Sequence, residues 1–429
     1  MDSKKKKKKD AGKEHKENYK EYTATVEDIE RFLSDNVTLR NNVVTGRAEC
    51  RIPERDTFAE WTAEGLPADE WLPVSDRIVN TLWRILSREK KVKVDDIWRI
   101  IASDFVPEFN PFAFYLDHLP PWDGQDYILG MSVSVSVKGD VDQQMLFAQY
   151  LKKWLVGMVA GWLDAQVVNN VILVLIGEQG VYKTTWFQYL LPPDLRRYFR
   201  IKTNSSHTTK DDLLALTQYG LVCYEELDAM TPRDLNQLKS AVTMTSVDER
   251  IPYDRYPDHR PHIASFCGTG NNVQFLSDST GNRRWLPFEV ESIDSPREHP
   301  FDYDHIYAQA YALYRQGFHY WFSRTEIETL AVHNRQFETP RLEQELVDIY
   351  FRKPADGERG EFMPVTRAMQ IVSGNLTQRL SSVSLGRAFM DQGYRQKRTS
   401  NSRGYIVVRR SAEEIQIRMH AVALDDKPF

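Results

Sequence analysis

One stretch limits what this 429-residue chain can fold into. Six apolar residues, Val171–Ile176, run directly into a glycine loop that carries Lys183 and Thr184, and an apolar segment then extends to Leu191 before two prolines. A strand without polar alternation is buried on both faces, as in parallel sheets covered by helices. The sequence therefore predicts an α/β domain with the order strand, loop, helix.

The loop matches the pattern G-x-x-x-x-G-K-[ST] at all positions but one. Glycines let backbone N–H groups surround an anion, and the start of the following helix attracts phosphate. We expect ATP at this loop, with Lys183 on the β- and γ-phosphates and the Thr184 hydroxyl on Mg²⁺. The residues expected to contact the nucleotide are Gly177, Glu178, Gln179, Gly180, Val181, Tyr182, Lys183, Thr184 and Thr185.

Tyr182 stands where the pattern has its second glycine. A side chain at this position is expected to need a negative φ and to point away from the phosphates, because nucleotide binding would otherwise fail. The backbone amide donor is retained. A DNA-binding regulator with a weak or vestigial nucleotide site therefore stays open as the alternative to an active ATPase.

A second apolar strand, Tyr219–Tyr224, ends in Glu225 and Glu226. Carboxylates at the carboxyl end of a parallel strand lie beside the glycine loop, where open α/β sheets bind ligands. We expect Glu225 to hold Mg²⁺ and its neighbour to orient the attacking water. Asp228 is the alternative for either role.

A third strand is expected at His262–Cys267, and Asn271 follows it. An amide at that point would bind the γ-phosphate or the water. Arg283 and Arg284 come soon after, on a turn that begins with glycine. Paired arginines suit a finger that stabilises charge on the transferred phosphoryl group, and an ordinary surface pair is the alternative.

Two segments offer cations for DNA. The first, Asp248–Pro261, is dense in proline, tyrosine and arginine, and a salt-bridged surface loop is its alternative reading. The second, Tyr394–Arg410, reads as a strand, turn and strand without any acidic residue, and a protein-docking edge is its alternative. The predicted DNA contacts are Arg255, His259, Arg260, Arg395, Lys397, Arg398 and Arg403, with Arg409 and Arg410 extending the second group.

The composition limits the possible partners and cellular compartment less strictly than the motifs do. A net charge of −5 decides nothing about nucleic acid, because basic residues can act locally. The three cysteines are far apart and form no C-x-x-C, which favours a reducing cytoplasm and argues against structural zinc. Asp164, Asn169 and Asn170 interrupt the long apolar region before the glycine loop, so no membrane span is expected.

The predicted organisation has five parts. A basic disordered tail (1–22) precedes a mainly helical N-terminal lobe (23–140), which is expected to hold a helix at 23–33 and a hairpin turning at Thr45-Gly46. The ATPase domain covers 141–325. Three helices and the basic hairpin predict a winged-helix DNA-binding domain at 340–412, and a tail occupies 413–429.

Taken together, these motifs resemble the virulence-associated protein E family of phage and mobile-element proteins, within the superfamily 3 helicase-like AAA+ ATPases. The resemblance covers residues 23–325. It rests on the motif order: Asn41-Asn-Val-Val-Thr-Gly46, Leu119-Pro-Pro-Trp-Asp-Gly124, Gly177-Glu-Gln-Gly-Val-Tyr-Lys-Thr-Thr185, Tyr224-Glu-Glu-Leu-Asp228, Arg250-Ile-Pro-Tyr253 with Arg260-Pro261, Gly268-Thr-Gly-Asn271 and Thr280-Gly-Asn-Arg-Arg284.

The resemblance implies roles for these residues. Lys183 and Thr184 would bind ATP and Mg²⁺, the two glutamates would be Walker B acids, and Asn271 would be the sensor. Arg283 or Arg284 would reach into a neighbour's site, which implies a homo-oligomeric ring, usually a hexamer. Segment 250–261 would grip single-stranded DNA, and a primase, if used, would be a separate chain.

The resulting expectation is a DNA-dependent ATPase that acts on single-stranded or forked DNA as a ring-forming helicase or replication initiator. A defence or interference ATPase on the same scaffold is a further alternative. A small-molecule kinase is disfavoured, because it would not need paired arginines or a basic C-terminal hairpin.

Overall fold

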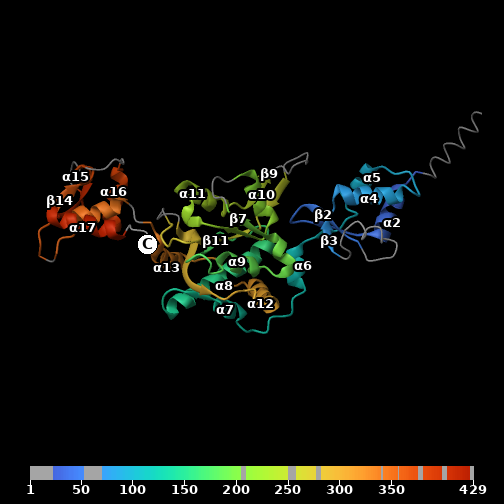
Figure 1. Cartoon of the computed structure of the whole chain (residues 1–429), viewed down its shortest axis with the longest axis horizontal. Helices are drawn as coiled ribbons and strands as arrows, with labels where there is room; N and C mark the ends of the chain where they lie inside the picture. Colours follow the sequence, from blue (N-terminus) through green and yellow to red (C-terminus); the bar gives the residue numbers. More distant parts are fainter. Residues whose placement is uncertain are drawn as a thin grey trace, which may run out of the picture. The chain divides into compact units, whose positions relative to one another are not determined.

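The computed structural model describes residues 23–52, 70–203, 209–249, 258–276, 282–339, 342–355, 357–374, 380–398 and 403–425. The chain forms two compact units (Figure 1). The first comprises Met1–Val273 and Arg283–Val332, and the second comprises Gln274–Asn282 and His333–Phe429. The expected tail at 1–22 lies outside the described residues.

The first unit is built around a six-stranded sheet with the order β5-β12-β6-β11-β8-β7. Its strands are β5 (Val135–Val137), β12 (Trp285–Ile293), β6 (Ile172–Ile176), β11 (Ser265–Gly270), β8 (Leu221–Tyr224) and β7 (Phe199–Lys202). Every pair among the last five is parallel, and β5 is antiparallel to β12. All residues of β6 are buried. The predicted α/β architecture with a buried parallel sheet is thereby confirmed.

Strand β11 differs from the prediction of His262–Cys267, which was wrong by three residues at each end. The strand includes Gly268 and Gly270, which were expected to terminate it. A Cβ on Gly268 would lie 2.3 Å from Leu227 Cδ1, so the strand can pass beneath this leucine only if a glycine stands there. The glycine thus serves close packing between two segments.

Helices cover both faces of this sheet. In the view of Figure 1, α7 (Tyr127–Ser132), α8 (Val141–Leu163) and α12 (Tyr303–Arg315) lie below the sheet and pack against one another, and α10 (Lys210–Gln218) and α11 (Pro232–Ala241) lie above it. None of the helices in the described ranges combines the length and apolar character needed to cross a membrane.

The hydrophobic core around the sheet includes a segment that was expected in the N-terminal lobe. Phe112 and Leu116 of α6 (Pro111–Asp117), Ile128 and Met131 of α7, and Val135 of β5 are buried in it. The lobe has its own core, whose buried residues run from Ile29 to Val106. Apart from Val44, which is buried in the core around the sheet, the residues of the two cores separate along the chain near residue 110, whereas the predicted boundary was residue 140.

The N-terminal lobe is mixed rather than mainly helical. Helices α2 (Val26–Asn36), α4 (Asp76–Leu86) and α5 (Val94–Ile101) accompany a sheet with the order β3-β2-β1-β4, formed by β1 (Thr38–Asn42), β2 (Arg47–Arg51), β3 (Trp71–Pro73) and β4 (Glu108–Phe109). Thr25 caps α2 in a capping box, as the sequence predicts. Strands β1 and β2 form the predicted hairpin, and Gly46 in its turn has a φ of 66°.

A buried polar cluster joins this hairpin to the six-stranded sheet within the first unit. Glu49 is 2% exposed and pairs with Arg40 and with Arg197, each at 2.8 Å. Asn42 Nδ2 donates to Glu49 Oε1 at 2.9 Å and to the Tyr198 hydroxyl at 2.6 Å. We call these five residues the Glu49 network. Because Arg197 and Tyr198 immediately precede β7, the network links the lobe to the edge of the central sheet.

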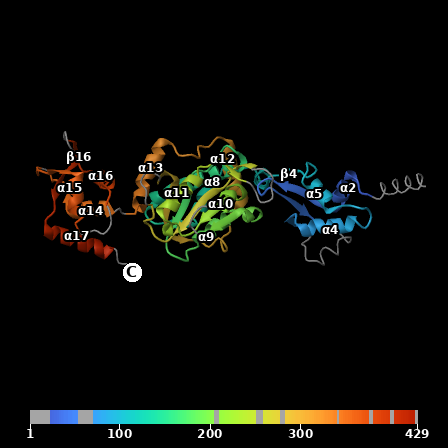
Figure 2. The same ribbon diagram turned by 90° about the horizontal axis from the view of Figure 1, so that it is seen from above.

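The second unit contains the expected three helices and the expected hairpin (Figure 2). They are α14 (Leu342–Tyr350), α15 (Val365–Val372), α16 (Ser382–Asp391), β15 (Gln396–Arg398) and β16 (Arg403–Arg409), and β16 also pairs with β13 (Phe351–Arg352) and β14 (Glu361–Pro364). The segment expected as a tail instead forms α17 (Ala412–Asp425). Arg418 of α17 pairs with Asp348 of α14 at 2.5 Å, which fastens this helix to the unit.

Candidate functional site

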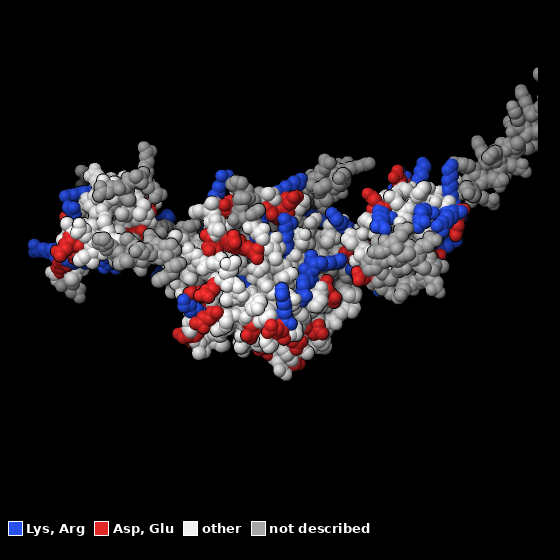
Figure 3. Space-filling model, in the orientation of Figure 1, with Lys and Arg blue, Asp and Glu red and all other residues white. Residues whose placement is uncertain are grey.

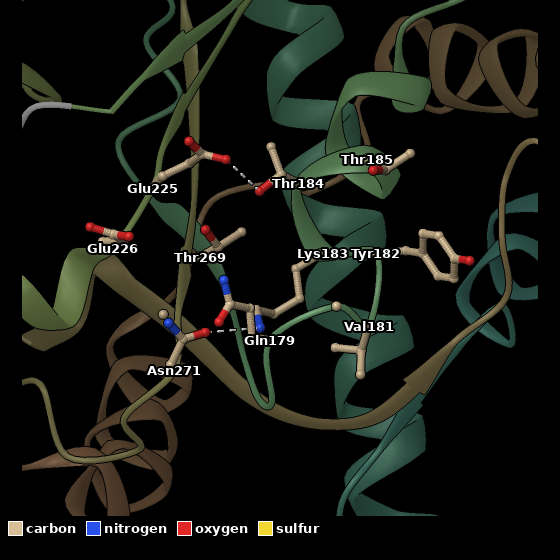
Figure 4. Close-up of a pocket in the computed structure, with 12 residues that line it drawn as sticks. Gln179, Val181, Tyr182, Lys183, Thr184, Thr185, Glu225, Glu226, Thr269 and Asn271 are labelled. Atoms are coloured by element: carbon tan, nitrogen blue, oxygen red, sulfur yellow. Dashed lines mark hydrogen bonds between the residues drawn. The ribbon is translucent and has the colours of Figure 1, made fainter.

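A pocket of about 360 Å³ lies at the carboxyl ends of β6, β8 and β11 (Figure 4). Strands β6 and β11 end level there, since Ile176 pairs with Gly270, and β8 ends two residues earlier, where Tyr224 pairs with Gly268. The glycine loop after β6 and the start of α9 (Lys183–Leu190) form one wall. The lining residues are Gln179, Gly180, Val181, Tyr182, Lys183, Thr184, Thr185, Glu225, Glu226, Thr269, Gly270 and Asn271.

Lys183 is 7% exposed and lies at the centre of the loop. Its Nζ donates hydrogen bonds to the carbonyl oxygens of Gly177 and Glu178 at 2.6 and 2.7 Å, and to Asn271 Oδ1 at 3.3 Å. Burial lowers the pKa of Lys183, while the charge of Asp228 raises it. No carboxylate of a described residue lies within ion-pair distance of Lys183, so its charge can be used by an entering anion.

Thr184 and Glu225 meet across the pocket. The Thr184 hydroxyl donates to Glu225 Oε1 at 2.8 Å (Figure 4). Hydroxyl and carboxylate oxygens are ligands that Mg²⁺ accepts, and Mg²⁺ usually completes its shell with water and phosphate oxygens. Among the described residues, no group of three or more His, Cys, Asp or Glu could hold a metal ion alone. The donor set therefore suits Mg²⁺ that arrives with a phosphate ligand.

The other two acids near this edge differ from each other. Glu226 is exposed, lines the pocket and has a φ of 55°, in the left-handed region. Asp228 Oδ2 accepts from the Asn272 backbone N–H at 3.0 Å, and its Oδ1 has no hydrogen-bond partner within the described part of the chain. A buried carboxylate oxygen without a donor is costly. Asp228 does not line the pocket, and its Oδ1 lies against Gly270 at the end of β11.

Thr269 was not foreseen as a pocket residue. It is 5% exposed and lies between Gly268 and Gly270 at the end of β11. The sequence signal was the Gly-Thr-Gly run, which was read as the turn after the strand. Because the strand continues through this run, the threonine side chain is set beside the pocket (Figure 4).

The predicted negative φ at Tyr182 was wrong. The residue has φ 64° and ψ 15°, the left-handed conformation that glycine usually supplies, which costs another residue about 1–2 kcal/mol. The bend is needed because α9 starts at Lys183, and the Tyr182 carbonyl accepts its first hydrogen bond, from Trp186 N–H at 2.8 Å. The ring is 45% exposed and points away from Glu225 and Asn271, as expected (Figure 4).

Arg283 and Arg284 are not in this pocket. They lie in a short 3₁₀ turn (Asn282–Arg284) directly before β12. Trp285, the first residue of β12, pairs with Ile172 at the start of β6. The arginines therefore lie at the amino ends of the parallel strands, roughly 13 Å along β6 from the glycine loop. Burial lowers the pKa of Arg284, and the charge of Arg283 lowers it further.

The expected DNA-contacting residues fall into three groups. Arg255 lies outside the described residues. His259 and Arg260 are on β10 (Asp258–Pro261), which pairs with β9 (Ser246–Glu249). His259 Nδ1 is 2.6 Å from Asp248 Oδ1, and the Arg260 guanidinium packs against Gly46. Arg395, Lys397, Arg398 and Arg403 are all exposed on the C-terminal hairpin, Arg409 is exposed as well, and Arg410 is half-buried.

Comparisons with known proteins give a family match and a set of similar folds. The model of the virulence-associated protein E-like domain matches residues 116–339, a little over half of the chain. No curated protein matches the sequence.

Two solved structures of the NrS-1 C-terminal region (305–718), both in the apo form, resemble the chain. The first covers 89% of this chain and 98% of its own length, at 13% identity and a TM-score of 0.47. The second, the A form, has the same coverage at 12% identity and a TM-score of 0.46.

Proposed function

Because the chain belongs to the virulence-associated protein E-like family, with the matched residues surrounding the pocket, we propose that it is a DNA-dependent ATPase of a phage or mobile element. In this proposal it is a superfamily 3 helicase-like AAA+ motor that forms a ring on single-stranded or forked DNA and serves replication. The observation that carries the proposal is the pocket itself, where Lys183, Thr184, Glu225 and Asn271 converge on the glycine loop.

The residues present fit Mg²⁺·ATP. Lys183 and the backbone N–H groups of the loop would hold the phosphates, and Thr184 and Glu225 would hold Mg²⁺. Bound Mg²⁺ would supply charge neutralisation at the phosphates. Glu226 or Asp228 would accept a proton from, or orient, the attacking water, and Asn271 would position it. These groups act through placement and charge, which provide most of the catalysis in phosphoryl transfer.

A ring is supported by the place of the arginines. Arg283 and Arg284 lie at the amino ends of the parallel strands, whereas their own pocket lies at the carboxyl ends. Within this proposal they therefore serve the pocket of a neighbouring copy. Complementation tests this step. A Lys183→Ala chain and an Arg283→Ala/Arg284→Ala chain should each be inactive, and mixing them should restore part of the turnover. Failure of the mixture to regain any activity would remove the support for shared sites.

DNA binding is supported by local cations and not by the overall charge. Acidic and basic residues are interspersed over the face of the first unit drawn in Figure 3, in keeping with a net charge of −5. The exposed hairpin β15–β16 and the three helices before it would form a winged helix, with Arg395, Lys397, Arg398 and Arg403 on phosphates. A primase, if used, would be a separate chain.

The decisive experiment measures ATP turnover with and without single-stranded DNA, alongside the mass of the assembly. Lys183→Ala should lower DNA-stimulated turnover at least about 100-fold, since it removes the only buried cation of the pocket among the described residues, and should leave the fold intact. Lys138→Ala is a matched control, because this exposed lysine only pairs with Glu289 on the surface. Undiminished turnover in Lys183→Ala would refute the assignment.

One observation favours a second candidate. Tyr182 holds a left-handed conformation at a position where the loop pattern has glycine, and such backbone strain is what a degenerate site would retain. A DNA-binding regulator with a vestigial nucleotide site predicts DNA binding through the hairpin but no turnover in the unaltered chain. The turnover measurement separates the two candidates directly.

A further inference from the structure

The side chain of Tyr182 has no role in the proposed chemistry, although it lines the pocket. Its ring is 45% exposed, and its hydroxyl makes no hydrogen bond to another described residue. Its backbone is held in a conformation that favours glycine. Since glycine would fit here without strain, the ring needs an explanation other than the path of the backbone.

The position of the ring defines one end of the pocket. Glu225, Glu226 and Asn271 lie at one end, and Tyr182 and Thr185 lie at the other (Figure 4). A nucleotide whose terminal phosphate meets the acids and the asparagine must direct its sugar and base toward the opposite end. The aromatic ring is therefore on the nucleoside side of the site.

Among the described residues that line the nucleotide pocket, Tyr182 is the only aromatic one. Trp186, the next aromatic residue along α9, is fully buried. The Trp186 indole N–H donates to Ser134 Oγ at 2.9 Å, and its ring meets that of Phe301 edge-on at 6.0 Å between centroids. Ser134 and Phe301 line a second cavity of about 350 Å³, but no described residue of the glycine loop or of α9 lines that cavity. Tyr182 is therefore the ring that borders the nucleotide pocket.

We propose that the Tyr182 ring is a stacking face for the base of the nucleotide bound in this pocket. The inference rests on the proposed function, because it requires a nucleotide in the site. Every base presents a flat π-face to an aromatic ring, so stacking contributes affinity without reading hydrogen-bonding groups. Tyr182 thus adds contact to the nucleoside, which a glycine at this position cannot provide.

The test compares a ligand with a base to one without. Binding of ATP and of inorganic tripolyphosphate, each with Mg²⁺, is measured by calorimetry for the unaltered chain and for Tyr182→Asn, Tyr182→Phe and Tyr182→Gly. Asparagine tolerates the left-handed conformation but lacks the ring, phenylalanine keeps the ring, and glycine removes both strain and ring. The set separates the effect of the ring from that of the backbone.

We expect Tyr182→Asn to weaken ATP binding about 10-fold or more, with tripolyphosphate affinity changed less than about twofold, because only the stacked base is lost. Tyr182→Phe should restore ATP binding relative to Tyr182→Asn. Equal losses for both ligands, or tighter binding of both by Tyr182→Gly and Tyr182→Asn, would overturn the stacking role. Binding of neither ligand by the unaltered chain would instead overturn the proposed function, and this inference with it.

Discussion

The Glu49 network and the pocket around Lys183 are both clusters of charged side chains in the first unit, but they differ in how those charges are paired. In the network, one buried carboxylate forms ion pairs with two arginines and accepts a hydrogen bond from an asparagine. The Arg40 guanidinium also lies 3.8 and 3.7 Å from the ring centroids of Trp71 and Phe109. In the pocket, the lysine donates only to neutral oxygens. Asp228 is not among the residues that line the pocket, but one of its buried oxygens lacks a donor within the described ranges.

Backbone strain follows the same division. Tyr182 and Glu226 are the only non-glycine residues with positive φ in the described chain, and both line the pocket. Backbone strain and unpaired polar groups persist where a ligand can compensate for them. In a cluster that only joins two parts of the fold, the protein itself supplies the partner of every charged group. The two clusters should therefore respond oppositely to substitution, in stability and in activity.

The largest expected effect is on the network. Glu49→Gln should lower the free energy of unfolding by about 3–5 kcal/mol, because it leaves Arg40 and Arg197 without their buried counter-charge. ATP turnover per folded molecule should be unchanged. Urea denaturation with turnover measured on the same samples checks both. A variant as stable as the unaltered chain would contradict the structural role of the network.

The converse effect is expected in the pocket. Glu225→Gln should lower turnover about 100-fold or more, close to 3 kcal/mol in the barrier, while stability changes little. Glu226→Gln is the matched comparison, since its side chain is exposed and the Thr184 hydroxyl contacts Glu225. A Mg²⁺ titration of turnover should shift to higher concentration in Glu225→Gln alone. A similar shift in Glu226→Gln would reassign the metal-holding acid.

Gly46 tests how the lobe meets the hairpin β9–β10. A Cβ at Gly46 would lie 2.2 Å from an Arg260 guanidinium nitrogen, in addition to the cost of a φ of 66°. Gly46→Ala should destabilise the protein by about 1–3 kcal/mol. Gly124→Ala is the control, because Gly124 has a φ of 89° but no atom within 4 Å of its Cβ position. Equal effects in thermal unfolding would show that the Arg260 contact adds nothing.

The smallest effect concerns a partly exposed ion pair and depends on pH. Burial raises the pKa of Glu326, but the Ser323 amide and the Lys153 ammonium more than offset this and hold it at about 2. An acid with a lowered pKa stabilises the fold above its ordinary value of 4.5, and this contribution is lost as the pH falls toward 2. Glu326→Gln should therefore cost about 1–2 kcal/mol at pH 7 and less near pH 3. A cost that is independent of pH would exclude the ion pair as its source.

The sequence predicted local features well where one segment determines them. The strand β6, the glycine loop, the capped helix α2 and the hairpin β1–β2 follow from periodicity, capping and turn residues within each segment. The sheet of the N-terminal lobe was missed because β3 and β4 are three and two residues long and are identified only by their partners.

The errors share a tertiary cause. Gly268 and Gly270 resemble strand terminators in sequence, but in the structure they let β11 pass beneath Leu227 and Asp228. The segment after Pro111 was included in the lobe, whose predicted boundary was residue 140, yet Phe112 stacks on Trp162 of α8 at 4.4 Å between ring centroids. At the site, the residues after each strand were predicted, whereas the left-handed Tyr182 and the buried Thr269 depend on segments distant in the sequence.

The separation of Arg283 and Arg284 from the glycine loop has a consequence for dosage. If each copy supplies its arginines to the pocket of another copy, a monomer can bind ATP but cannot hydrolyse it. Output would then rise more steeply than in proportion to the amount of protein. In an element that encodes such a chain, ATP hydrolysis would be absent at low protein concentration. It would begin only above a threshold concentration at which the copies assemble, without any separate inhibitor.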